Sequence, residues 1–335
     1  MKQQFKLIIL IAVLVLVVSF AIPILLVLPF SGEKASGKLD ENLKNTASTL
    51  KSSVEVAVYR NSSKKVEKFP LEEYVIGVVA SEMPAKFEEE ALKAQALAAR
   101  TYIVNHLLIK SDLPKGANVT DTVNDQVFKS KQELKKIWAK DYNWKINKIT
   151  QAVKSTEGKI LTYQGKPIFA AFFSTSNGYT ENAEEYWSKA IPYLKSVESP
   201  WDKNSPEYVS KKTLTVNDFE NMLGVKLNGT NDIGTITTLT KGKKVGTIVI
   251  AGKKFSGREV REKLNLRSSD FSFVRVDDKI IITTKGYGHG VGMSQYGANE
   301  MAKSGENYLN IVKHYYKGVK VESSNQLLDK VTAKR

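Results

Sequence analysis

The sequence predicts an α+β fold, with mixed helices and antiparallel strands or hairpins around a binding groove, preceded by one transmembrane helix. Three observations predict it. A long uncharged apolar segment stands near the N-terminus, and short apolar segments further on are separated by turn residues. Helical segments are interleaved with these strands without the regular strand–helix–strand repeat of a parallel sheet.

The N-terminal apolar segment predicts a membrane anchor. Leu7–Phe30 carries no charge and spans about 36 Å as a helix, against a hydrocarbon core of roughly 30 Å. A cleaved signal has a shorter apolar part, of about 7–15 residues, and ends in small residues, whereas this segment ends in Pro29-Phe30-Ser31. Lys2 and Lys6 favour a cytoplasmic tail at residues 1–6, with the rest of the chain outside. A cleaved signal with a long apolar core is the alternative.

The composition restricts partners and chemistry. The net charge is +15, from 50 basic and 35 acidic residues, so the surface attracts polyanions such as nucleic acid, anionic lipid or anionic wall polymers. No nucleic-acid-reading motif is present and the basic residues are spread along the chain, so no nucleic-acid partner is expected. The chain has no cysteine, and its three histidines are far apart in sequence, so no metal site is predicted.

The residues after the anchor divide into a linker, a folded region and a tail. Residues 31–53 hold hardly any large apolar side chain and are expected to be a flexible tether. Folded sequence begins with the alternating strand Val54–Tyr59. We expect one extracytoplasmic domain at 54–320, with a possible subdomain at 201–284, and a polar tail at 321–335.

Proline and acidic residues mark the predicted helices. Pro70 fits the first position of a helix that ends before Pro84, since proline pushes the residue before it out of helical geometry. A second, alanine-rich helix is expected at Phe87–Leu108, with Glu88–Glu90 at the positive end of its dipole. A small helix is expected at Val216–Leu223.

Turn residues between apolar segments predict two hairpins and one further strand. The first hairpin turns at Gln164–Pro167 and the second at Ala251-Gly252. The last strand leads into a glycine-rich segment. The expected strands are Ile160–Tyr163, Ile168–Phe173, Val245–Ile250, the segment that ends at Phe255, and Ile280–Thr284.

The glycine-rich segment Gly286–Ala298 is the most distinctive part of the chain. Its glycines stand at every second position up to Gly292, which suits a backbone that another group approaches closely. Because it also holds His289, Ser294 and Gln295, we interpret it as part of a site. A glycine-rich hairpin with a structural histidine is the alternative. Met293-Ser294 and not a Lys-Ser/Thr pair follows Gly292, so the segment is not a phosphate-binding loop.

Glu82 is the predicted general acid. It lies at the end of the first helix, near the negative pole of the dipole and among apolar neighbours, and both effects raise its pKa. A carboxylic acid that keeps its proton near neutral pH suits proton donation to a glycosidic oxygen. A solvated helix end before a proline is the alternative.

Two basic residues of the second helix, Lys93 and Arg100, share nearly one helical face. Arg100 has no acid at helical spacing, so we expect it to be free for an oxygen-rich ligand or for a partner from elsewhere in the fold. Lys93 follows Glu89 by four residues, so an ordinary surface ion pair is the alternative for this lysine.

A third cluster combines aromatic and hydroxyl side chains within Phe172–Glu181, Tyr186-Trp187 and Ile191–Lys195. Aromatic faces stack on sugar rings while polar groups bind the sugar hydroxyls, so this mixture indicates a sugar site. A turn at the edge of the core is the alternative.

These motifs, in this order, resemble the stage II sporulation protein D family of endospore-forming bacteria. The resemblance covers roughly residues 54–320, and the single N-terminal anchor agrees with it. The motifs are Ala80–Pro84, Ala91–Tyr102, Ser174–Gly178, Phe255–Arg261 and Gly286–Ala298.

The resemblance implies a membrane-anchored lytic transglycosylase that acts on peptidoglycan during engulfment of the forespore, through a glycan-binding groove. Such enzymes cut the bond from N-acetylmuramic acid to N-acetylglucosamine without water and leave a 1,6-anhydro sugar. The resemblance implies Glu82 as the catalytic residue. The residues expected to bind substrate are Ser81, Lys93, Arg100, Ser176, Tyr193, Lys195, His289, Ser294 and Gln295.

Partners and a location are implied in the same way. The expected substrate is peptidoglycan glycan strands already stripped of stem peptides by a partner cell-wall amidase. Both proteins are expected to assemble with a multispanning membrane protein of the engulfment machinery. The chain is expected in the cell membrane, with its catalytic domain between the two membranes of the sporangium. A non-catalytic glycan-binding scaffold or activator of the amidase is the alternative.

One departure from the family concerns zinc. Some relatives carry cysteine and histidine near the segment that matches Ser174–Gly178 and bind zinc there. This segment holds neither residue type in the present chain, so we expect no metal and no cofactor.

Overall fold

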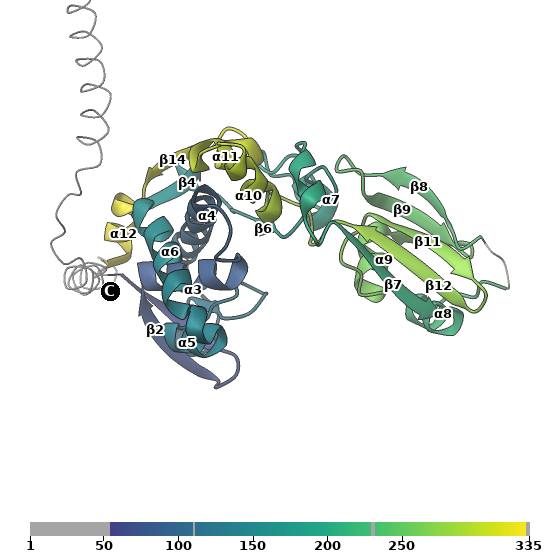
Figure 1. Cartoon of the computed structure of the whole chain (residues 1–335), viewed down its shortest axis with the longest axis horizontal. Coiled ribbons are helices and arrows are strands. Elements are labelled where there is room, and N and C mark those ends of the chain that lie inside the picture. The colour runs from purple at the N-terminus through teal and green to yellow at the C-terminus, as the bar shows by residue number, and fades with distance from the viewer. Residues whose placement is uncertain (1–53, 110, 229–231, 333–335) are drawn as a thin grey trace, which may run out of the picture. The chain divides into compact units, whose positions relative to one another are not determined.

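The computed structural model describes residues 54–332, except 110 and 229–231 (Figure 1). The predicted tail at 1–6, anchor at 7–30 and linker at 31–53 lie outside the described residues and stay predictions. Within the described ranges, none of the helices combines the length and the apolar character needed to cross a bilayer. These ranges are a mixture of helices and mostly antiparallel strands, which confirms the predicted α+β class.

A three-stranded sheet opens the described part of the chain. Its central strand pairs antiparallel with one neighbour and parallel with the other. Three consecutive residues of this strand, 56–58, are buried, although the alternating sequence predicted burial on one face alone. In spatial order the strands are β2 (Lys65–Pro70), β1 (Glu55–Arg60) and β3 (Val119–Thr120).

The second strand of this sheet runs directly into α3 (Leu71–Glu82). Pro70 is therefore the N-cap residue, outside the helix, whereas the sequence predicted it at the first helical position. The helix ends where the sequence indicates, because Met83, which precedes Pro84, has an extended backbone. Glu82 is thus the last helical residue.

The helix α4 (Glu89–Leu108) is the one on which several other helices pack (Figure 1). It begins two residues after the predicted start at Phe87 and ends where predicted. Its alanines between residues 91 and 99 are all buried, and their small side chains let neighbouring backbones approach closely. The helices that contact it include α3, α6 (Tyr142–Ser155), α10 (Gln295–Lys303), α11 (Tyr308–Tyr315) and α12 (Asn325–Thr332).

Two short sheets join the middle of the chain to its C-terminal part. In one, a central strand pairs antiparallel with two others, and in the second, two strands pair in parallel. The first sheet consists of β14 (Lys320–Ser323), β4 (Lys159–Tyr163) and β5 (Lys166–Pro167), and the second of β6 (Phe172–Phe173) and β13 (Met293–Ser294).

The first predicted hairpin is confirmed only near its turn. Gln164-Gly165 has positive φ at both residues, as in a two-residue hairpin turn, and the returning strand ends at Pro167. The strand predicted at Ile168–Phe173 is wrong except for its last two residues. The residues after β5 turn away from β4 and pair with the glycine-rich segment instead. The Ala171 carbonyl accepts the N–H of Met293 there.

Residues 209–285 fold around a hydrophobic cluster of their own, to which two antiparallel sheets and two helices contribute (Figure 1). Phe219, Ile248, Phe255 and Ile282 are among its buried members. The predicted helix, second hairpin and last strand in this region are confirmed. The elements are β7 (Val209–Thr215), α8 (Val216–Leu223), β8 (Thr235–Leu239), β9 (Val245–Ile250), β10 (Lys253–Ser256), α9 (Gly257–Lys263), β11 (Phe271–Val276) and β12 (Lys279–Lys285).

The folded part continues past residue 320, where the sequence predicted a polar tail. β14 pairs with β4, and α12 contacts α4, so residues up to 332 belong to the domain. The remaining short helices are η1 (Pro114–Gly116), α5 (Lys131–Trp138), η2 (Ala139–Asp141), α7 (Ala183–Trp187) and η3 (Pro200–Asn204).

Gly292 is the glycine that the junction between β6 and β13 requires. Its φ is +81°, and a Cβ added there lies 2.0 Å from the carbonyl oxygen of Ala171. Gly252, in the second hairpin turn, has a φ of +79° but no heavy atom within 4 Å of such a Cβ. The two positions share a backbone conformation and differ in the space around it.

We predict that Gly292→Ala costs far more stability than Gly252→Ala. The left-handed backbone alone costs a residue with a side chain about 1–2 kcal/mol, which is the loss expected at Gly252. The additional backbone collision raises the loss at Gly292 to about 4 kcal/mol or more. Urea denaturation of both variants measures the difference, and equal losses would contradict the close approach.

Candidate active site

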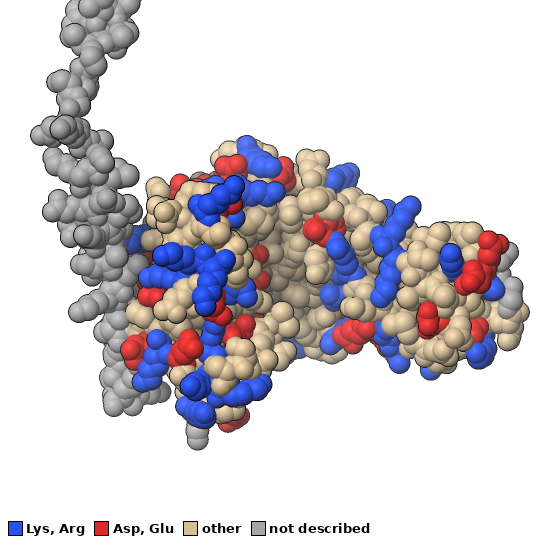
Figure 2. All heavy atoms as spheres, turned by 60° about the horizontal axis from the view of Figure 1, so that its bottom comes forward, with Lys and Arg blue, Asp and Glu red and all other residues tan. Residues whose placement is uncertain are grey.

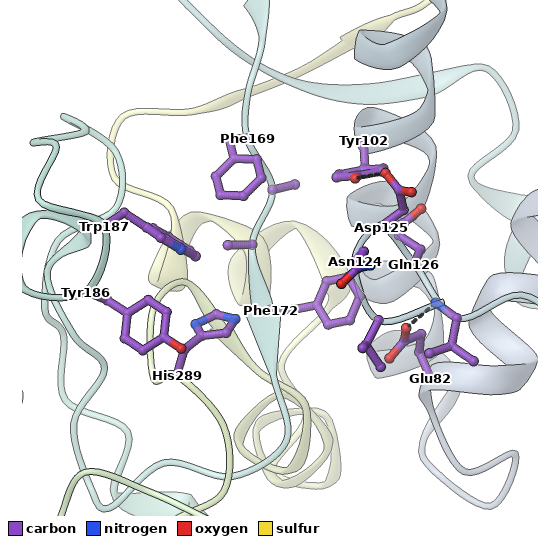
Figure 3. Close-up of a pocket in the computed structure, with 14 residues that line it drawn as sticks. Glu82, Tyr102, Asn124, Asp125, Gln126, Phe169, Phe172, Tyr186, Trp187 and His289 are labelled. Carbon is purple, nitrogen blue, oxygen red and sulfur yellow. Dashed lines mark hydrogen bonds between the residues drawn. The ribbon is translucent and has the colours of Figure 1, made fainter. Parts of the chain in front are cut away.

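An open cavity of about 420 Å³, called the groove here, lies beside the end of α3 (Figure 3). The loop between β3 and α5 borders it on the side of Glu82, and aromatic side chains border it on the side of His289. The groove is lined by Glu82, Tyr102, residues 123–127, residues 169–172, Tyr186, Trp187 and His289.

The Glu82 carboxyl group is partly buried in this groove (Figure 3). Its Oε1 accepts the backbone N–H of Val127 at 2.9 Å. Its Oε2 has no hydrogen-bond partner among the residues that the structure describes. Burial raises the pKa of Glu82, and the Val127 hydrogen bond offsets part of this because it stabilises the carboxylate. The predicted direction of the shift is confirmed, with burial as its main cause.

Two of the predicted substrate-binding residues hold the end of α3 in place. Gln295 Nε2 donates to the Glu82 backbone carbonyl at 3.0 Å, a group that has no partner within the helix. Ser81 Oγ donates to the carbonyl of Gly77 at 2.7 Å, one turn back along the helix. Neither residue lines the groove. Gln295 is therefore a link from the glycine-rich segment to the helix that carries Glu82.

Asp125 shapes the loop that presents the Val127 N–H. Its Oδ2 accepts the N–H and the hydroxyl of Thr120, at 2.8 and 2.7 Å, and its Oδ1 accepts the hydroxyl of Tyr102 at 2.8 Å. Both carboxylate oxygens are thus engaged, although Asp125 also lines the groove. These three bonds hold the middle of the loop in place.

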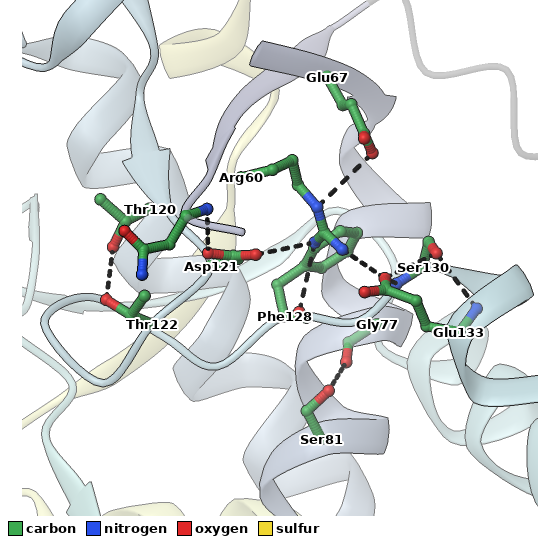
Figure 4. Close-up of polar contacts among 11 residues, drawn as sticks. Arg60, Glu67, Gly77, Ser81, Thr120, Asp121, Thr122, Phe128, Ser130 and Glu133 are labelled. Atoms are coloured by element: carbon green, nitrogen blue, oxygen red, sulfur yellow. Dashed lines mark hydrogen bonds and ion pairs between the residues drawn. The ribbon is translucent and has the colours of Figure 1, made fainter. Parts of the chain in front are cut away.

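Arg60 secures the far end of the same loop (Figure 4). Its guanidinium group donates to the Phe128 carbonyl at 3.4 Å, lies 3.4 Å from the Asp121 carboxylate and pairs with Glu133 at the start of α5. The Arg60 side chain is almost fully buried. The loop is therefore held at both ends, and Val127 is fixed by contacts with residues distant in sequence.

Aromatic rings and His289 form a wall across the groove from Glu82 (Figure 3). The Trp187 ring centroid lies 5.2 Å from that of Phe169, 5.5 Å from that of Tyr186 and 5.2 Å from that of His289. Apolar ring faces beside a protonatable acid suit a ligand with both apolar and hydroxyl-bearing faces. This confirms that Tyr186-Trp187, predicted as part of a cluster, lies at the candidate site.

Two arginines of α9 position Tyr186. Arg258 stacks over its ring at 4.5 Å and donates to its backbone carbonyl at 2.6 Å. Arg261 Nη1 donates to its hydroxyl at 3.2 Å. The motif Phe255–Arg261 thus connects the cluster at 209–285 with the aromatic wall.

His289 braces the glycine-rich segment and lines the groove. Its Nδ1 accepts the N–H of Val291 at 3.0 Å. Burial and the charges of Arg261 and Lys244 lower its pKa to about 4, against the effect of a hydrogen bond with the Phe172 backbone. The imidazole is therefore neutral at neutral pH.

Ser176 and Ser294, predicted to bind substrate, instead belong to a buried cluster around Asp202. Asp202 accepts the N–H and hydroxyl of Ser176 at 2.9 and 2.8 Å, the hydroxyl of Ser199 at 2.6 Å and that of Ser294. Ser176 is 1% and Ser294 0% exposed, so neither is open to a ligand. The prediction is corrected: these hydroxyls satisfy a buried carboxylate that joins the motif Ser174–Gly178 to the glycine-rich segment.

Of the two roles expected for Arg100, the structure shows the partner from elsewhere in the fold, so Arg100 is not free to bind a ligand as the resemblance implied. It is fully buried, and its Nε and Nη2 donate to the two carboxylate oxygens of Glu72 at 2.8 and 2.7 Å. It also donates to the carbonyls of Val153 and Lys159. The acid comes from α3, so helical spacing within α4 alone could not reveal it.

Lys93 forms an ordinary surface ion pair, as the alternative interpretation held. Its Nζ lies 2.8 Å from Glu89 and 2.7 Å from Glu90, and these pairs raise its pKa against the effect of burial. Lys93 does not line the groove.

Tyr193 and Lys195 lie next to the aromatic wall without lining the groove. The Tyr193 hydroxyl accepts the N–H of Phe169 at 2.9 Å and so orients the backbone of a groove residue. Lys195 pairs with Glu184 at 2.7 Å, on the helix that carries Tyr186. Both act on the site through the residues they hold.

The loop at 121–127 is the part of the site that sequence reasoning missed. Its threonines and Asn124-Asp125 signal a loop, but no local pattern indicates that a backbone N–H faces Glu82. No group of three or more histidine, aspartate or glutamate side chains in the described ranges is placed to hold a metal ion.

Fold and site together define an α+β protein with a groove lined by aromatic rings and by a partly buried acid, Glu82, one of whose oxygens has no partner among the described residues. Comparison with known proteins gives the family. A sequence profile described as Stage II sporulation protein matches residues 59–163, which include Glu82. Stage II sporulation protein D of Bacillus subtilis (strain 168) is 56% identical over 326 residues, 94% of this chain and 95% of that protein. The chain belongs to the stage II sporulation protein D family.

Two further relatives agree with this result. Stage II sporulation protein D of Bacillus amyloliquefaciens is 55% identical over 327 residues, again 94% of this chain and 95% of that protein. The Amidase enhancer of Bacillus subtilis (strain 168) is 31% identical over 302 residues, 74% of this chain but only 40% of that protein.

We predict that Arg100→Leu lowers the stability of the fold and has no direct effect on ligand binding. It leaves the Glu72 carboxylate buried without its partner, which costs about 3–5 kcal/mol of unfolding free energy. Lys93→Ala, seven residues earlier on the same helix, should cost less than about 1 kcal/mol because its pairs lie near the surface. Urea denaturation checks both values, and a fully stable Arg100→Leu protein with weakened glycan binding would show that Arg100 binds the ligand and does not hold the fold.

Proposed function

We propose that this protein is a lytic transglycosylase that cuts the bond from N-acetylmuramic acid to N-acetylglucosamine in peptidoglycan glycan strands. The observation that carries the proposal is the Glu82 carboxyl group. It is partly buried, its pKa is raised, one oxygen is held by the Val127 N–H and the other has no partner among the described residues. Because its pKa is raised, this carboxyl group stays protonated up to a pH nearer to neutral, and its second oxygen is available for proton transfer.

One carboxyl group is sufficient for both halves of the proposed reaction. Protonated Glu82 donates its proton to the glycosidic oxygen as the bond from the muramic anomeric carbon to that oxygen breaks. The Glu82 carboxylate then takes the proton of the C6 hydroxyl of the same muramic residue while O6 bonds to the anomeric carbon. The products are a 1,6-anhydro end and a free sugar hydroxyl, and no water is consumed.

The surroundings of the second groove carboxylate favour this chemistry over hydrolysis. Glycoside hydrolases generally need two working carboxylates at a set separation. Asp125 is the other carboxylate that lines the groove, and both of its oxygens accept hydrogen bonds from Tyr102 or Thr120. A carboxylate held in this way suits a structural role better than that of a nucleophile or base.

The aromatic wall supports a sugar polymer as the substrate. Rings of Phe169, Tyr186 and Trp187 border the groove across from Glu82, where they suit stacking on pyranose faces (Figure 3). The net charge of +15 favours association with an anionic wall polymer. Strands without stem peptides are part of the proposal, since removal of the peptide leaves the lactyl carboxylate free on the sugar itself.

Location and partners are part of the same proposal. The chain would be held in the cell membrane by residues 7–30, with its catalytic domain between the two membranes of the sporangium. It would act after a cell-wall amidase, together with a multispanning membrane protein of the engulfment machinery. Membership of the sporulation family and the relative named Amidase enhancer support this context.

A second candidate function is a scaffold that binds glycan and activates a cell-wall amidase without cutting. The name of the Amidase enhancer relative is the observation that favours it. The two functions differ in whether Glu82 is needed for glycan products, and this difference can be measured.

We predict that Glu82→Gln abolishes anhydro-muramic products from purified peptide-free strands while strand binding persists. Glutamine keeps the side-chain volume and an oxygen for the Val127 N–H but cannot transfer a proton. Mass spectrometry identifies the reaction, because anhydro products are lighter than hydrolytic ones by one water. Glu88→Gln, an exposed change outside the groove, is the matched control and should retain activity. Undiminished products from Glu82→Gln would refute the catalytic assignment.

The raised pKa of Glu82 also predicts a pH effect on stability. Because burial raises the folded pKa above the value of about 4.3 in an unfolded chain, ionisation costs folding free energy. The parent protein should lose stability relative to Glu82→Gln as pH rises from about 4.3 through the raised pKa of folded Glu82. Below about pH 4.3 the carboxyl group is protonated in both states, so the difference should vanish. Urea denaturation at acidic and neutral pH measures it. A loss of parent stability in acid instead would indicate a lowered pKa and a stabilised carboxylate.

A further inference from the structure

A second open cavity, of about 320 Å³, lies directly behind the end of α3. It is called the tryptophan cavity here, after its lining residues Trp138 and Trp144, and its other lining residues include Met83, Pro84, Lys86 and Lys145. Met83 follows Glu82 in the chain, so one short segment separates this cavity from the groove.

An exposed tryptophan distinguishes this cavity from an ordinary surface depression. The Trp144 residue is 48% exposed, which is uncommon for the largest apolar side chain. Lys145 Nζ lies 5.6 Å from the Trp138 ring centroid and 5.5 Å from that of Trp144. One ammonium group thus lies near both rings, so aromatic faces and a positive charge occur together.

The backbone that brings these rings together is strained. Ala139, which follows Trp138 and is the first residue of η2, has φ +45° and ψ −117°, a region that residues with a side chain rarely adopt. This conformation ends α5 directly after Trp138 and turns the chain toward α6, which carries Trp144. Strain of this kind persists only where surrounding structure enforces it, and it concentrates at ligand sites.

The charges around the cavity suit an acidic ligand. Lys86 is exposed and has no ion-pair partner among the described residues, while Lys145 shares its charge with Asp141 at 3.4 Å. Lys135, Lys136 and Lys140 of the neighbouring α5 and η2 are exposed and add to this positive potential, while Lys131 is exposed but pairs with Glu73 at 3.2 Å. Figure 2 shows basic side chains, with acidic ones among them, on the face of the molecule that it presents.

The segment that separates the two cavities is held rigidly. Lys148 of α6 donates to the Phe87 carbonyl at 2.6 Å, and the Glu88 N–H donates to Asn299 of α10 at 2.8 Å. Gln295, also of α10, holds the carbonyl of Glu82 itself. The positions of the tryptophan cavity and of Glu82 are therefore set by the same contacts.

We propose that the tryptophan cavity is a second subsite for the glycan strand, which holds an acidic amino sugar by stacking on Trp144 and Trp138 and by pairing its carboxylate with Lys86. The proposal rests on the proposed function for its choice of polymer. It deepens that function, because the lactyl carboxylate of the sugar itself is free only where the stem peptide has been removed. The subsite would therefore select peptide-free strands a short distance from the site of cleavage.

The test measures binding, not cleavage, and uses the full chain carrying Glu82→Gln so that strands stay intact. Equilibrium binding is measured with purified peptide-free glycan strands and with the same strands after their carboxylates are converted to amides. Trp144→Ala should weaken binding of both about tenfold, as expected for the loss of one aromatic contact. Lys86→Ala should weaken binding of the acidic strands alone and so remove the preference for them.

Ile137→Ala is the matched control, since this side chain is 58% exposed, lies on the same helix beside Trp138 and does not line the cavity. It should bind both strands like the parent. Trp144→Ala protein that binds as tightly as Ile137→Ala protein would overturn the subsite. Lys86→Ala protein that still prefers acidic strands would overturn the recognition of the carboxylate. These outcomes are separate from the catalytic role of Glu82, which product analysis alone decides.

Discussion

The candidate site depends on one partly buried carboxyl group at the end of a helix. Glu82 stands where α3 must stop, because Pro84 follows it, and the side chain enters a cavity instead of bulk solvent. Burial raises its pKa, while the single N–H of Val127 orients the carboxyl group without neutralising it. A closer cation would lower the pKa again and remove the proton that the proposed chemistry needs.

Around this acid, the buried charges serve to hold elements together. Arg100 pairs with Glu72 and so ties α3 to α4, and its further bonds reach α6 and β4. Asp202 gathers hydroxyl groups from segments more than ninety residues apart, among them the cap of α10. Arg100, Ser176 and Ser294, which were predicted to bind substrate, thus hold together the elements that form the groove.

The groove itself is assembled from parts that only the fold brings together. Its acid comes from α3, its orienting N–H from the loop before α5, and its aromatic wall from α7 and the segment before β6. The two arginines of α9 extend this dependence, since they fix Tyr186 from a region with its own core. A change far from Glu82 in sequence therefore reaches the site through defined contacts.

The sequence by itself determined the α+β class, the C-terminal end of α3, the helix α8, the second hairpin and the acid at position 82. All of these follow from local rules: proline excludes a continued helix, paired turn residues close a hairpin, and a terminal acid among apolar neighbours resists ionisation. The tertiary structure alone decided that Arg100 is buried against Glu72, that Ser176 and Ser294 bind Asp202, and that Val127 faces Glu82. Hydrogen bonds and ion pairs between distant segments depend on where the backbone places both partners, and residue spacing within one element carries no information about the second partner.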